Sequence, residues 1–403
     1  MTVSAVTESR LRPPIEVSPL ATILLAIVLG SIAIGWLVSA TQALLFLTGS
    51  MLGIALYQAS FGFTGGWRRF ATEGRSRGMR TQFLMIGLTA IIFIPLLSGV
   101  SPFDQTLVGA WAPVGVSVVL GAFLFGAGMQ LGGGCGSGTL FTVGGGSSRM
   151  LVTLTGFVVG AVVGTAHLPF WLSLPSLPAI KFGEAFGPLI GTGLTLAGIT
   201  AIIGILAVFE KRRHGNVESI VSGLSDFKGS KVLFGPWPLI IAALVLVAGN
   251  VMTLLLAGHP WSVTYGFGLW GAKIFSAIGI PVADWAFWQA PAQKLAFTRS
   301  VLFDVTSVMN FGVILGAALA ACLAGRFAQK SDVPLASYAA AILGGLLMGY
   351  GARLSFGCNI GALFSGIASG SLHGWVWFVL AYIGSLLGIA LRPLFGLDGF
   401  KKA

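Results

Sequence analysis

The sequence GAFLFGAGMQLGGGCGSGTLFTVGGGSS occupies residues 121–148, and GGLLMGYGARLSFGCNIGALFSGIASGS occupies residues 344–371. Adding 223 to the numbers of the first stretch superimposes it on the second without a gap, so that Gly126 matches Gly349 and Cys135 matches Cys358. A gapless match of this length indicates an internal duplication. Two copies of one glycine-rich stretch, each with one cysteine, predict a single central site to which both halves of the chain contribute.

The rest of the chain has the composition of a membrane protein. Hydrophobic residues make up 55% of the 403 residues, and charged residues only 9%. So few charges would leave the surface of a water-soluble protein of this size uncovered. The sequence also lacks the alternating segments of about ten residues that a membrane β-barrel needs. We therefore expect an all-α polytopic membrane protein in contact with the lipid bilayer.

Apolar windows of about 20 residues, long enough to cross a bilayer, predict about ten transmembrane helices. The windows lie near residues 20–38, 41–60, 83–101, 113–131, 149–170, 186–209, 235–257, 301–324, 334–353 and 372–391. The net charge of +11 comes from basic residues that cluster between these windows. Such clustering indicates topology rather than a nucleic-acid site, and with the N-terminus inside every basic loop is cytoplasmic.

The duplication and the windows together predict five parts of the chain. These are a cytoplasmic N-terminal tail (residues 1–19), a first membrane repeat (20–209), a cytoplasmic basic linker (210–234), a second membrane repeat (235–396) and a cytoplasmic C-terminal tail (397–403). Because the topology gives the two cysteine stretches opposite orientations, the repeats are expected to be inverted, an arrangement common in secondary transporters.

Each cysteine stretch belongs to a long interval without charge. Residues 105–148 form 44 such residues and residues 354–391 form 38, which is too many for one helix and too few for two helices with a polar loop. Non-helical backbone at membrane depth is tolerated only where protein buries it or where it lines a cavity. We therefore predict glycine-rich re-entrant loops, with two further re-entrant segments near residues 53–67 and 258–273.

The re-entrant segments hold the residues expected to bind a substrate. Glycines let the backbone approach a ligand closely, and helices that start there direct N–H groups toward an anion. A thiol can donate a weak S–H bond, exchange sulfur or ligate a soft metal. Neither a metal nor another cofactor is expected, because none of the four histidines lies in either cysteine stretch, residues 121–148 and 344–371. The predicted substrate-binding residues are Cys135, Cys358, Gly133, Gly134, Gly136, Gly357, Asn359, Thr64, Thr264, Arg353 and Lys273.

Three motifs carry a family resemblance. They are GGGCGSGT (132–139), FGCNIGALFSGIASGSLHGWVW (356–377) and YGFGLWGAK (265–273). The chain resembles the YeeE/YedE family of bacterial inner-membrane proteins, the sulfur-transport group. The resemblance implies uptake of thiosulfate through short loops that dip to the membrane centre, with S–H···S contacts from Cys135 and Cys358. Family members that carry thiosulfate have a further cysteine in the first re-entrant segment, whereas residues 61–66 here have none. A permease for selenium or other sulfur species therefore stays open as an alternative.

The sequence predicts a transporter rather than an enzyme. It has no Walker-type P-loop, so we expect no ATP hydrolysis by this chain. Uniport, proton coupling and handoff to a cytoplasmic sulfur-carrier protein are all compatible with the sequence. A membrane-bound sulfurtransferase with a cysteine persulfide is a rival from another class. That rival requires an accessible thiolate of low pKa, and neither cysteine has a histidine or lysine near it in the sequence.

Overall fold

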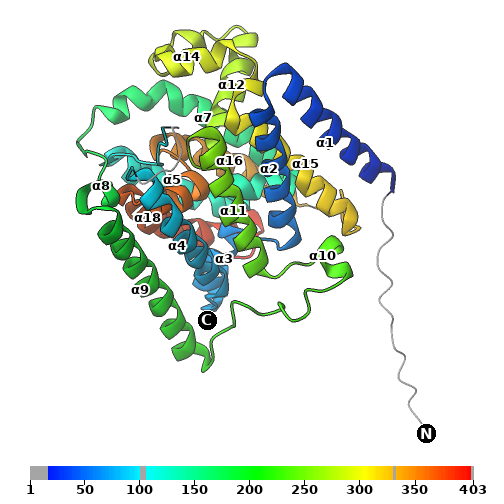
Figure 1. The fold of residues 1–403 in the computed structure, drawn as a ribbon, viewed down its shortest axis with the longest axis vertical. Helices are drawn as coiled ribbons and strands as arrows, with labels where there is room; N and C mark the ends of the chain where they lie inside the picture. The colour runs from blue at the N-terminus through cyan, green and yellow to red at the C-terminus, as the bar shows by residue number, and fades with distance from the viewer. Residues whose placement is uncertain (1–16, 100–105, 330–332, 401–403) are drawn as a thin grey trace.

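The computed structural model describes residues 17–99, 106–329 and 333–400 (Figure 1). Within these ranges, ten helical stretches are long and apolar enough to cross a membrane, so the protein is a helical multi-pass membrane protein, as the sequence predicts. The main helices are α1 (Val17–Leu37), α2 (Ala40–Gln58), α4 (Arg77–Leu97), α5 (Val116–Gly132), α7 (Ser148–Leu172), α9 (Pro188–His214), α11 (Leu239–Ala257), α15 (Val305–Leu323), α16 (Leu335–Leu354) and α18 (Leu372–Leu391).

Two of these helices extend beyond their apolar windows. Helix α4 begins at Arg77, six residues before its window, and α9 continues to His214, into the segment predicted to be a linker. The extra turns carry charges that are paired. Glu210 of α9 is fully buried and lies 3.2 Å from a guanidinium nitrogen of Arg80 in α4. An apolar window ends at the first cluster of charges, whereas a helix continues as long as its charged side chains find partners.

Shorter helices follow four of the long ones. Helix α3 (Phe63–Glu73) follows α2, and α6 (Gly136–Gly144) follows α5. Helix α12 (Thr264–Ala277) follows α11, and the π-helix η3 (Asn359–Phe364) with α17 (Ser365–Ala368) follows α16. The two cysteine stretches thus each consist of a long helix, a break and a short helix.

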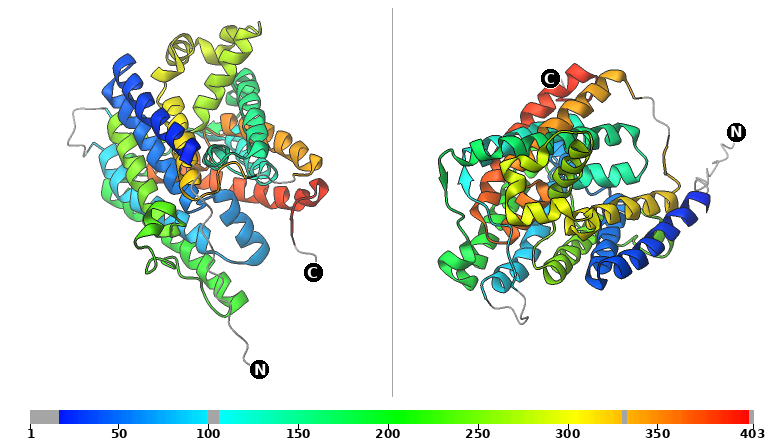
Figure 2. Two further views of the ribbon diagram at one scale, coloured as in Figure 1. Left: turned by 90° about the vertical axis from the view of Figure 1, so that its right-hand side faces the viewer. Right: turned by 90° about the horizontal axis from the view of Figure 1, so that it is seen from above.

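The remaining elements lie at the edges of the helix bundle (Figures 1 and 2). The strands β1 (Val114–Gly115) and β2 (Ser176–Leu177) pair antiparallel, with Val114 opposite Leu177. Helices α1 and α9 are peripheral, because only 11% and 17% of their apolar windows are buried by protein. The other short helices are α8 (Phe182–Phe186), α10 (Ser230–Phe234), η1 (Val282–Asp284), α13 (Ala286–Gln289), α14 (Pro291–Thr298), η2 (Val301–Phe303) and η4 (Arg392–Phe395).

Helix contacts come in matched pairs. Helix α5 packs against α18 and α16 packs against α7, while α5 and α16 also pack against each other. In the same way α2 packs against α15, α4 packs against α11, and α2 and α11 contact each other. If α2, α4, α5 and α7 are matched with α11, α15, α16 and α18 in chain order, each of these contacts has an equivalent contact with the two halves exchanged.

Glycines allow the central helices α5 and α16 to touch along their backbones. A Cβ atom at Gly121 would lie 2.7 Å from the carbonyl oxygen of Gly351, and one at Gly128 would lie 2.7 Å from that of Gly344. Under the sequence offset, Gly121 corresponds to Gly344 and Gly128 to Gly351. The two contacts are therefore the same contact with the roles of the two halves exchanged. Small residues at helix crossings are the usual means of close packing in membranes.

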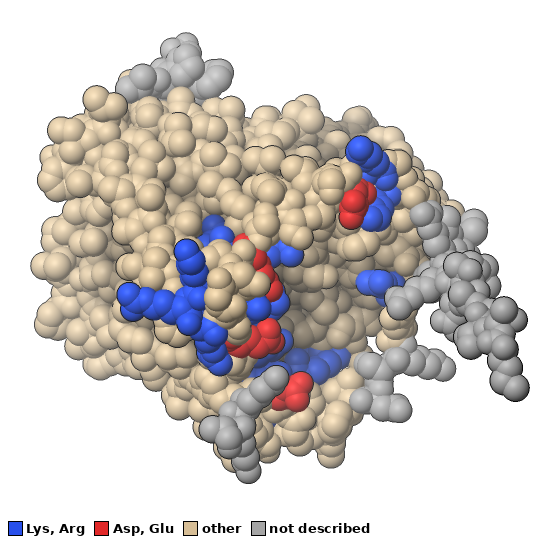
Figure 3. All heavy atoms as spheres, turned by 90° about the horizontal axis from the view of Figure 1, so that it is seen from below, with Lys and Arg blue, Asp and Glu red and all other residues tan. Residues whose placement is uncertain are grey.

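Two basic connecting segments lie side by side. Arg69 of α3 lies 2.8 Å from Glu218, and Arg75 lies 3.3 Å from Glu210. These contacts join the segment before α4 to the end of α9 and the segment after it. Lysines and arginines are prominent on the face seen from below in Figure 3. Among the other connections, the backbone N–H of Val108 donates to the carbonyl of Gly258.

Candidate functional site

The two duplicated cysteines come together inside the protein. Cys135 and Cys358 are both fully buried. A Cβ atom at Gly136, the residue after Cys135, would lie 3.0 Å from the Cys358 sulfur. The breaks in the two cysteine stretches therefore meet, and a glycine at position 136 makes room for the thiol of the other half.

Cys135 stands at the start of α6 with its sulfur among polar groups. Gly133 ends α5 in the left-handed region, with φ +92°, which reverses the chain and allows α6 to begin one residue after Cys135. The sulfur lies 3.6 Å from the Ser137 hydroxyl. Backbone N–H groups of Gly138 and Phe63 also face it. The first of these belongs to α6 and the second to α3, so two helix N-termini contribute to the surroundings of this thiol.

Cys358 occupies the corresponding place before η3. Its sulfur accepts a bond from the Ile360 N–H at 3.4 Å. The residue that corresponds to Gly133 is Phe356, and it too has a positive φ, +58°. A bulky side chain in this region costs about 1–2 kcal/mol. The second half thus keeps the backbone conformation of the first at an energetic cost, with an aromatic residue in the place of glycine.

Four N-terminal helix ends converge on the two thiols. The Cβ position of Gly136 in α6 lies 3.4 Å from the Val263 side chain, which precedes α12. The Cβ position of Gly361 in η3 lies 3.5 Å from the Ser262 hydroxyl, in the same segment. With the α3 N-terminus facing Cys135, the ends of α3, α6, α12 and η3 surround one point. Unpaired N–H groups at such ends carry partial positive charge and favour an anion.

Buried polar atoms without partners lie at the same helix ends. Among the described residues, the Thr64 hydroxyl, the Trp261 indole nitrogen and both amide atoms of Asn359 are buried and have no hydrogen-bond partner. Thr64 is the second residue of α3, Trp261 lies three residues before α12, and Asn359 begins η3. An unsatisfied buried polar group costs about 1–3 kcal/mol, so these groups have hydrogen bonds to offer a ligand.

Neutral amide side chains hold the N-termini of α3 and α12 in place. Gln130 donates to the carbonyl of Thr64 at 3.2 Å. Asn310 donates to the carbonyl of Val263 at 2.9 Å, and Asn250 accepts from the backbone N–H of Trp261 at 2.8 Å. Trp261 and Asn250 were not predicted. The only sequence signal for Trp261 is its place in the segment 258–273.

Nine of the predicted residues belong to the segments that meet at the thiols. Besides the cysteines, Thr64 and Asn359, they are Gly133, Gly134, Gly136, Thr264 and Gly357. The two predicted cations differ in their contacts. Lys273 donates to the backbone carbonyls of Phe297 and Arg299, in α14 and directly after it. Arg353 lies over the rings of Phe287 in α13 and Tyr265 in α12, 5.0 and 5.8 Å from their centres. Tyr265 is the second residue of α12, so Arg353 contacts the first turn of that helix, whereas Lys273 contacts α14.

Two arginines cap the end of α5 beside the Cys135 break. Arg149 donates to the carbonyls of Leu131 and Gly132 at 2.7 and 2.6 Å. Arg392 donates to the carbonyl of Gln130 at 2.6 Å. The last carbonyls of a helix lack partners within it, and here three in succession receive guanidinium donors. These arginines position the break rather than face the thiols.

Arg149→Ala is therefore expected to lower the anion uptake that the sequence predicts by about tenfold or more, because two helix-end carbonyls lose charged donors worth roughly 1.5–3 kcal/mol each. Arg149→Lys should recover only part of the activity, since an ammonium does not reproduce the two-pronged bond. A membrane-permeant maleimide should also label Cys135 faster in Arg149→Ala. The control is Arg212→Ala at the exposed end of α9. Unchanged uptake and labelling in Arg149→Ala would contradict the positioning role.

Comparison with known proteins identifies the family. A family model described as sulphur transport matches residues 58–387, which include all four central helix ends. The chain belongs to the sulphur transport family. Within the described residues, no group of three or more His, Cys, Asp or Glu side chains is placed to hold a metal ion.

Curated proteins that this chain is similar to are named as transporters. The thiosulfate transporter TsuA of Spirochaeta thermophila is 26% identical over 353 residues, which cover 84% of this chain and 95% of the relative. The thiosulfate transporter TsuA of Escherichia coli is 24% identical over 372 residues, which cover 83% of this chain and 90% of the relative. The probable transporter YedE of Escherichia coli is 30% identical over 164 residues. The match to that relative spans 39% of its length.

Proposed function

We propose that the protein takes up a small sulfur-containing anion, thiosulfate, across the bacterial inner membrane. The observation that carries this proposal is the meeting of Cys135 and Cys358 at four helix N-termini. Two relatives named as thiosulfate transporters match more than four fifths of the chain. Thiosulfate has an oxyanion end that suits N–H donors and a terminal sulfur that suits a thiol donor.

The anion passes from one thiol to the other near the bilayer centre. Each S–H group donates to the terminal sulfur, while the helix ends and the unpartnered groups of Thr64, Trp261 and Asn359 receive the oxygens. Neutral donors suit this task, because a fixed cation at the centre would hold the anion too tightly to release it. Lys273 would then act away from the thiol pair, where its contacts lie, and Arg353 would act from behind the first turn of α12, over Tyr265.

The route implies an inverted repeat with re-entrant segments. In this arrangement α5, the Cys135 break and α6 enter from the cytoplasmic face, and α16, the Cys358 break and η3 enter from the opposite face. The exchanged glycine contacts between α5 and α16 and the matched helix pairs support such a two-fold relation. The gathering of basic segments on one face supports cytoplasmic N- and C-termini under the positive-inside rule.

Both thiols are fully buried, and the donors that the described residues offer them are hydroxyl and backbone N–H groups. A sulfurtransferase needs a thiolate that its acceptor can reach. The surroundings therefore suit hydrogen bonding to a passing anion better than covalent exchange of sulfur.

The test is uptake of ³⁵S-thiosulfate by bacteria that lack their own sulfur-anion uptake systems, with and without this protein. We expect uptake and growth on thiosulfate as sole sulfur source only in cells with the protein. Unlabelled selenite, sulfite and sulfate serve as competitors. If selenite enters the cells and thiosulfate does not, the substrate is selenite and not thiosulfate. If none of these anions enters, the proposal is wrong.

A further inference from the structure

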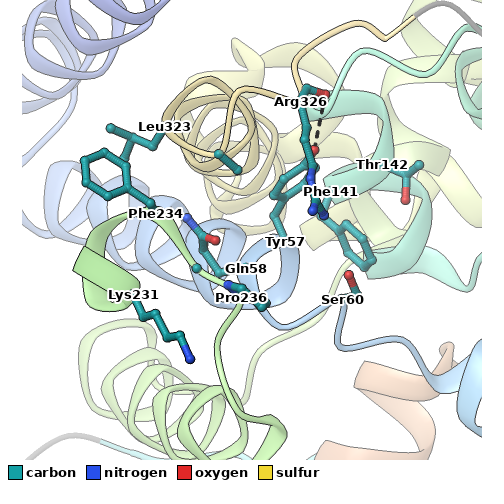
Figure 4. Close-up of a pocket in the computed structure, with 12 residues that line it drawn as sticks. Tyr57, Gln58, Ser60, Phe141, Thr142, Lys231, Phe234, Pro236, Leu323 and Arg326 are labelled. Atoms are coloured by element: carbon teal, nitrogen blue, oxygen red, sulfur yellow. Dashed lines mark hydrogen bonds between the residues drawn. The ribbon is translucent and has the colours of Figure 1, made fainter. Parts of the chain in front are cut away.

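A pocket of about 640 Å³ opens on the basic face of the molecule, separate from the thiol pair (Figure 4). It is bounded by the end of α2, the last turn of α6, α10 and the segment after α15. Its lining holds two cations, Lys231 and Arg326, and no carboxylate. The polar lining residues are Tyr57, Gln58, Ser60 and Thr142.

The pocket shares two chain segments with the thiol site. Phe141 and Thr142 line it from α6, the helix that begins beside Cys135. At 1.5 Å per residue, six residues of helix separate Cys135 from Phe141 by about 9 Å. Ser60 lines the pocket only three residues before Phe63, whose N–H faces the Cys135 sulfur. The pocket therefore lies one short helix away from the central site.

A hydrogen bond to the Arg326 backbone holds this residue at the edge of the pocket. The Tyr57 hydroxyl donates to the Arg326 carbonyl at 3.5 Å, and the Arg326 side chain extends past Tyr57 toward Phe141 (Figure 4). Glycine at position 145 is needed here, because a Cβ atom there would lie 2.6 Å from the Tyr57 ring. Ser60 has a positive φ of +48°, a conformation that costs a non-glycine residue free energy, and it lines the same space.

The helix dipole makes this pocket different from the thiol site. Helix α6 directs its N-terminal end to Cys135 and its C-terminal end, with partial negative charge, to the pocket. The N-terminal end attracts an anion and the C-terminal end repels it. Only the cations of the pocket offset this repulsion, so an anion there should bind more weakly than at the thiols and depend on Arg326.

From this arrangement we propose a second oxyanion site in the pocket, with Arg326 as its principal ligand and Lys231 as a further cation. The inference rests on the proposed function in one respect: an anion leaving the thiol pair along α6 would reach this site before the aqueous phase. The chemistry itself, a small oxyanion bound by a guanidinium in a carboxylate-free pocket, does not depend on transport.

The experiment measures ³⁵S-thiosulfate binding to purified full-length protein in phosphatidylcholine nanodiscs. In the double variant Cys135→Ala/Cys358→Ala, saturable binding should remain, with lower affinity than in the unaltered protein. Adding Arg326→Gln to that background should weaken the remaining binding about tenfold or more. Adding Arg212→Gln, which removes an exposed arginine from α9 outside the pocket, should leave it unchanged.

No binding in the double variant, or binding insensitive to Arg326→Gln, would overturn the second site. Failure of uptake by the unaltered protein would instead overturn the proposed function and leave this binding result standing. The same measurement in phosphatidylglycerol nanodiscs separates two sources of the oxyanion. If thiosulfate binding persists there, the ligand is the free anion. If it disappears, and mass spectrometry finds phosphatidylglycerol retained only when Arg326 is present, the site holds a lipid phosphate.

Discussion

Replacing Cys135 or Cys358 with alanine is expected to lower thiosulfate uptake at least about a hundredfold while leaving the amount of protein in the membrane unchanged. Each thiol is fully buried where four helix ends meet. A donor lost in such a site costs about 1–3 kcal/mol, more when the acceptor is charged, and 2.7 kcal/mol corresponds to a factor of 100. The measurement is the initial rate of ³⁵S-thiosulfate uptake, normalised to membrane protein.

The third cysteine provides the control for this prediction. Cys322 is also fully buried, but it lies in α15 among the apolar residues of another cluster, so Cys322→Ala should transport normally. Uptake retained in both Cys135→Ala and Cys358→Ala would rule out the thiol relay. Intact-mass measurement after incubation with thiosulfate provides a second readout. An added mass of about 32 Da, one sulfur atom, on the unaltered protein would favour persulfide chemistry over hydrogen bonding.

Gly126→Ala is expected to cause a large loss of stability. A Cβ atom at Gly126 in α5 would lie 1.9 Å from the carbonyl oxygen of Ala381 in α18, a distance that no pair of such atoms tolerates. The two helices must move apart, and overpacking of this kind costs about 1–3 kcal/mol or more. We expect the apparent melting temperature of the purified protein to fall and the aggregated fraction on size exclusion to rise.

The duplication adds a matched variant to that experiment. Gly349 is the counterpart of Gly126, and its Cβ would lie 2.2 Å from the carbonyl oxygen of Phe157 in α7, so Gly349→Ala should destabilise to a similar degree. The control is Gly204→Ala in the peripheral helix α9, where nothing lies within 4 Å of the added carbon. Equal stability of Gly126→Ala and Gly204→Ala would show that the helix crossing does not need its glycine.

Much of this architecture follows from local sequence. The ten windows lie where the structure has its ten spanning stretches, because burial in lipid requires about 20 apolar residues whatever the tertiary contacts are. The offset of 223 pairs Cys135 with Cys358, and duplicated segments adopt similar conformations. Even Phe356 adopts the positive φ of its counterpart Gly133, although its side chain disfavours that conformation.

Other features depend on partners that are distant in sequence. The apolar windows begin α4 too late and end α9 too early. The reason is that Glu210 of α9 and Arg80 of α4, 130 residues apart in the sequence, stabilise each other. Trp261 and Asn250 belong to the site because a hydrogen bond joins α11 to the segment before α12, and no local pattern in the sequence indicates that bond. The contacts of Lys273 with the carbonyls of Phe297 and Arg299 likewise could not be read from its apolar neighbours.

Hydropathy and repetition are properties of the chain alone, and they predict a helical membrane protein with a duplicated cysteine segment. The folded molecule adds that the two thiols meet beside Gly136, that four helix ends surround them, and that Arg149 and Arg392 cap the end of α5. Those features arise from backbone contacts between distant helices. Glycine permits such contacts, but a glycine in the sequence does not say which backbone will approach it.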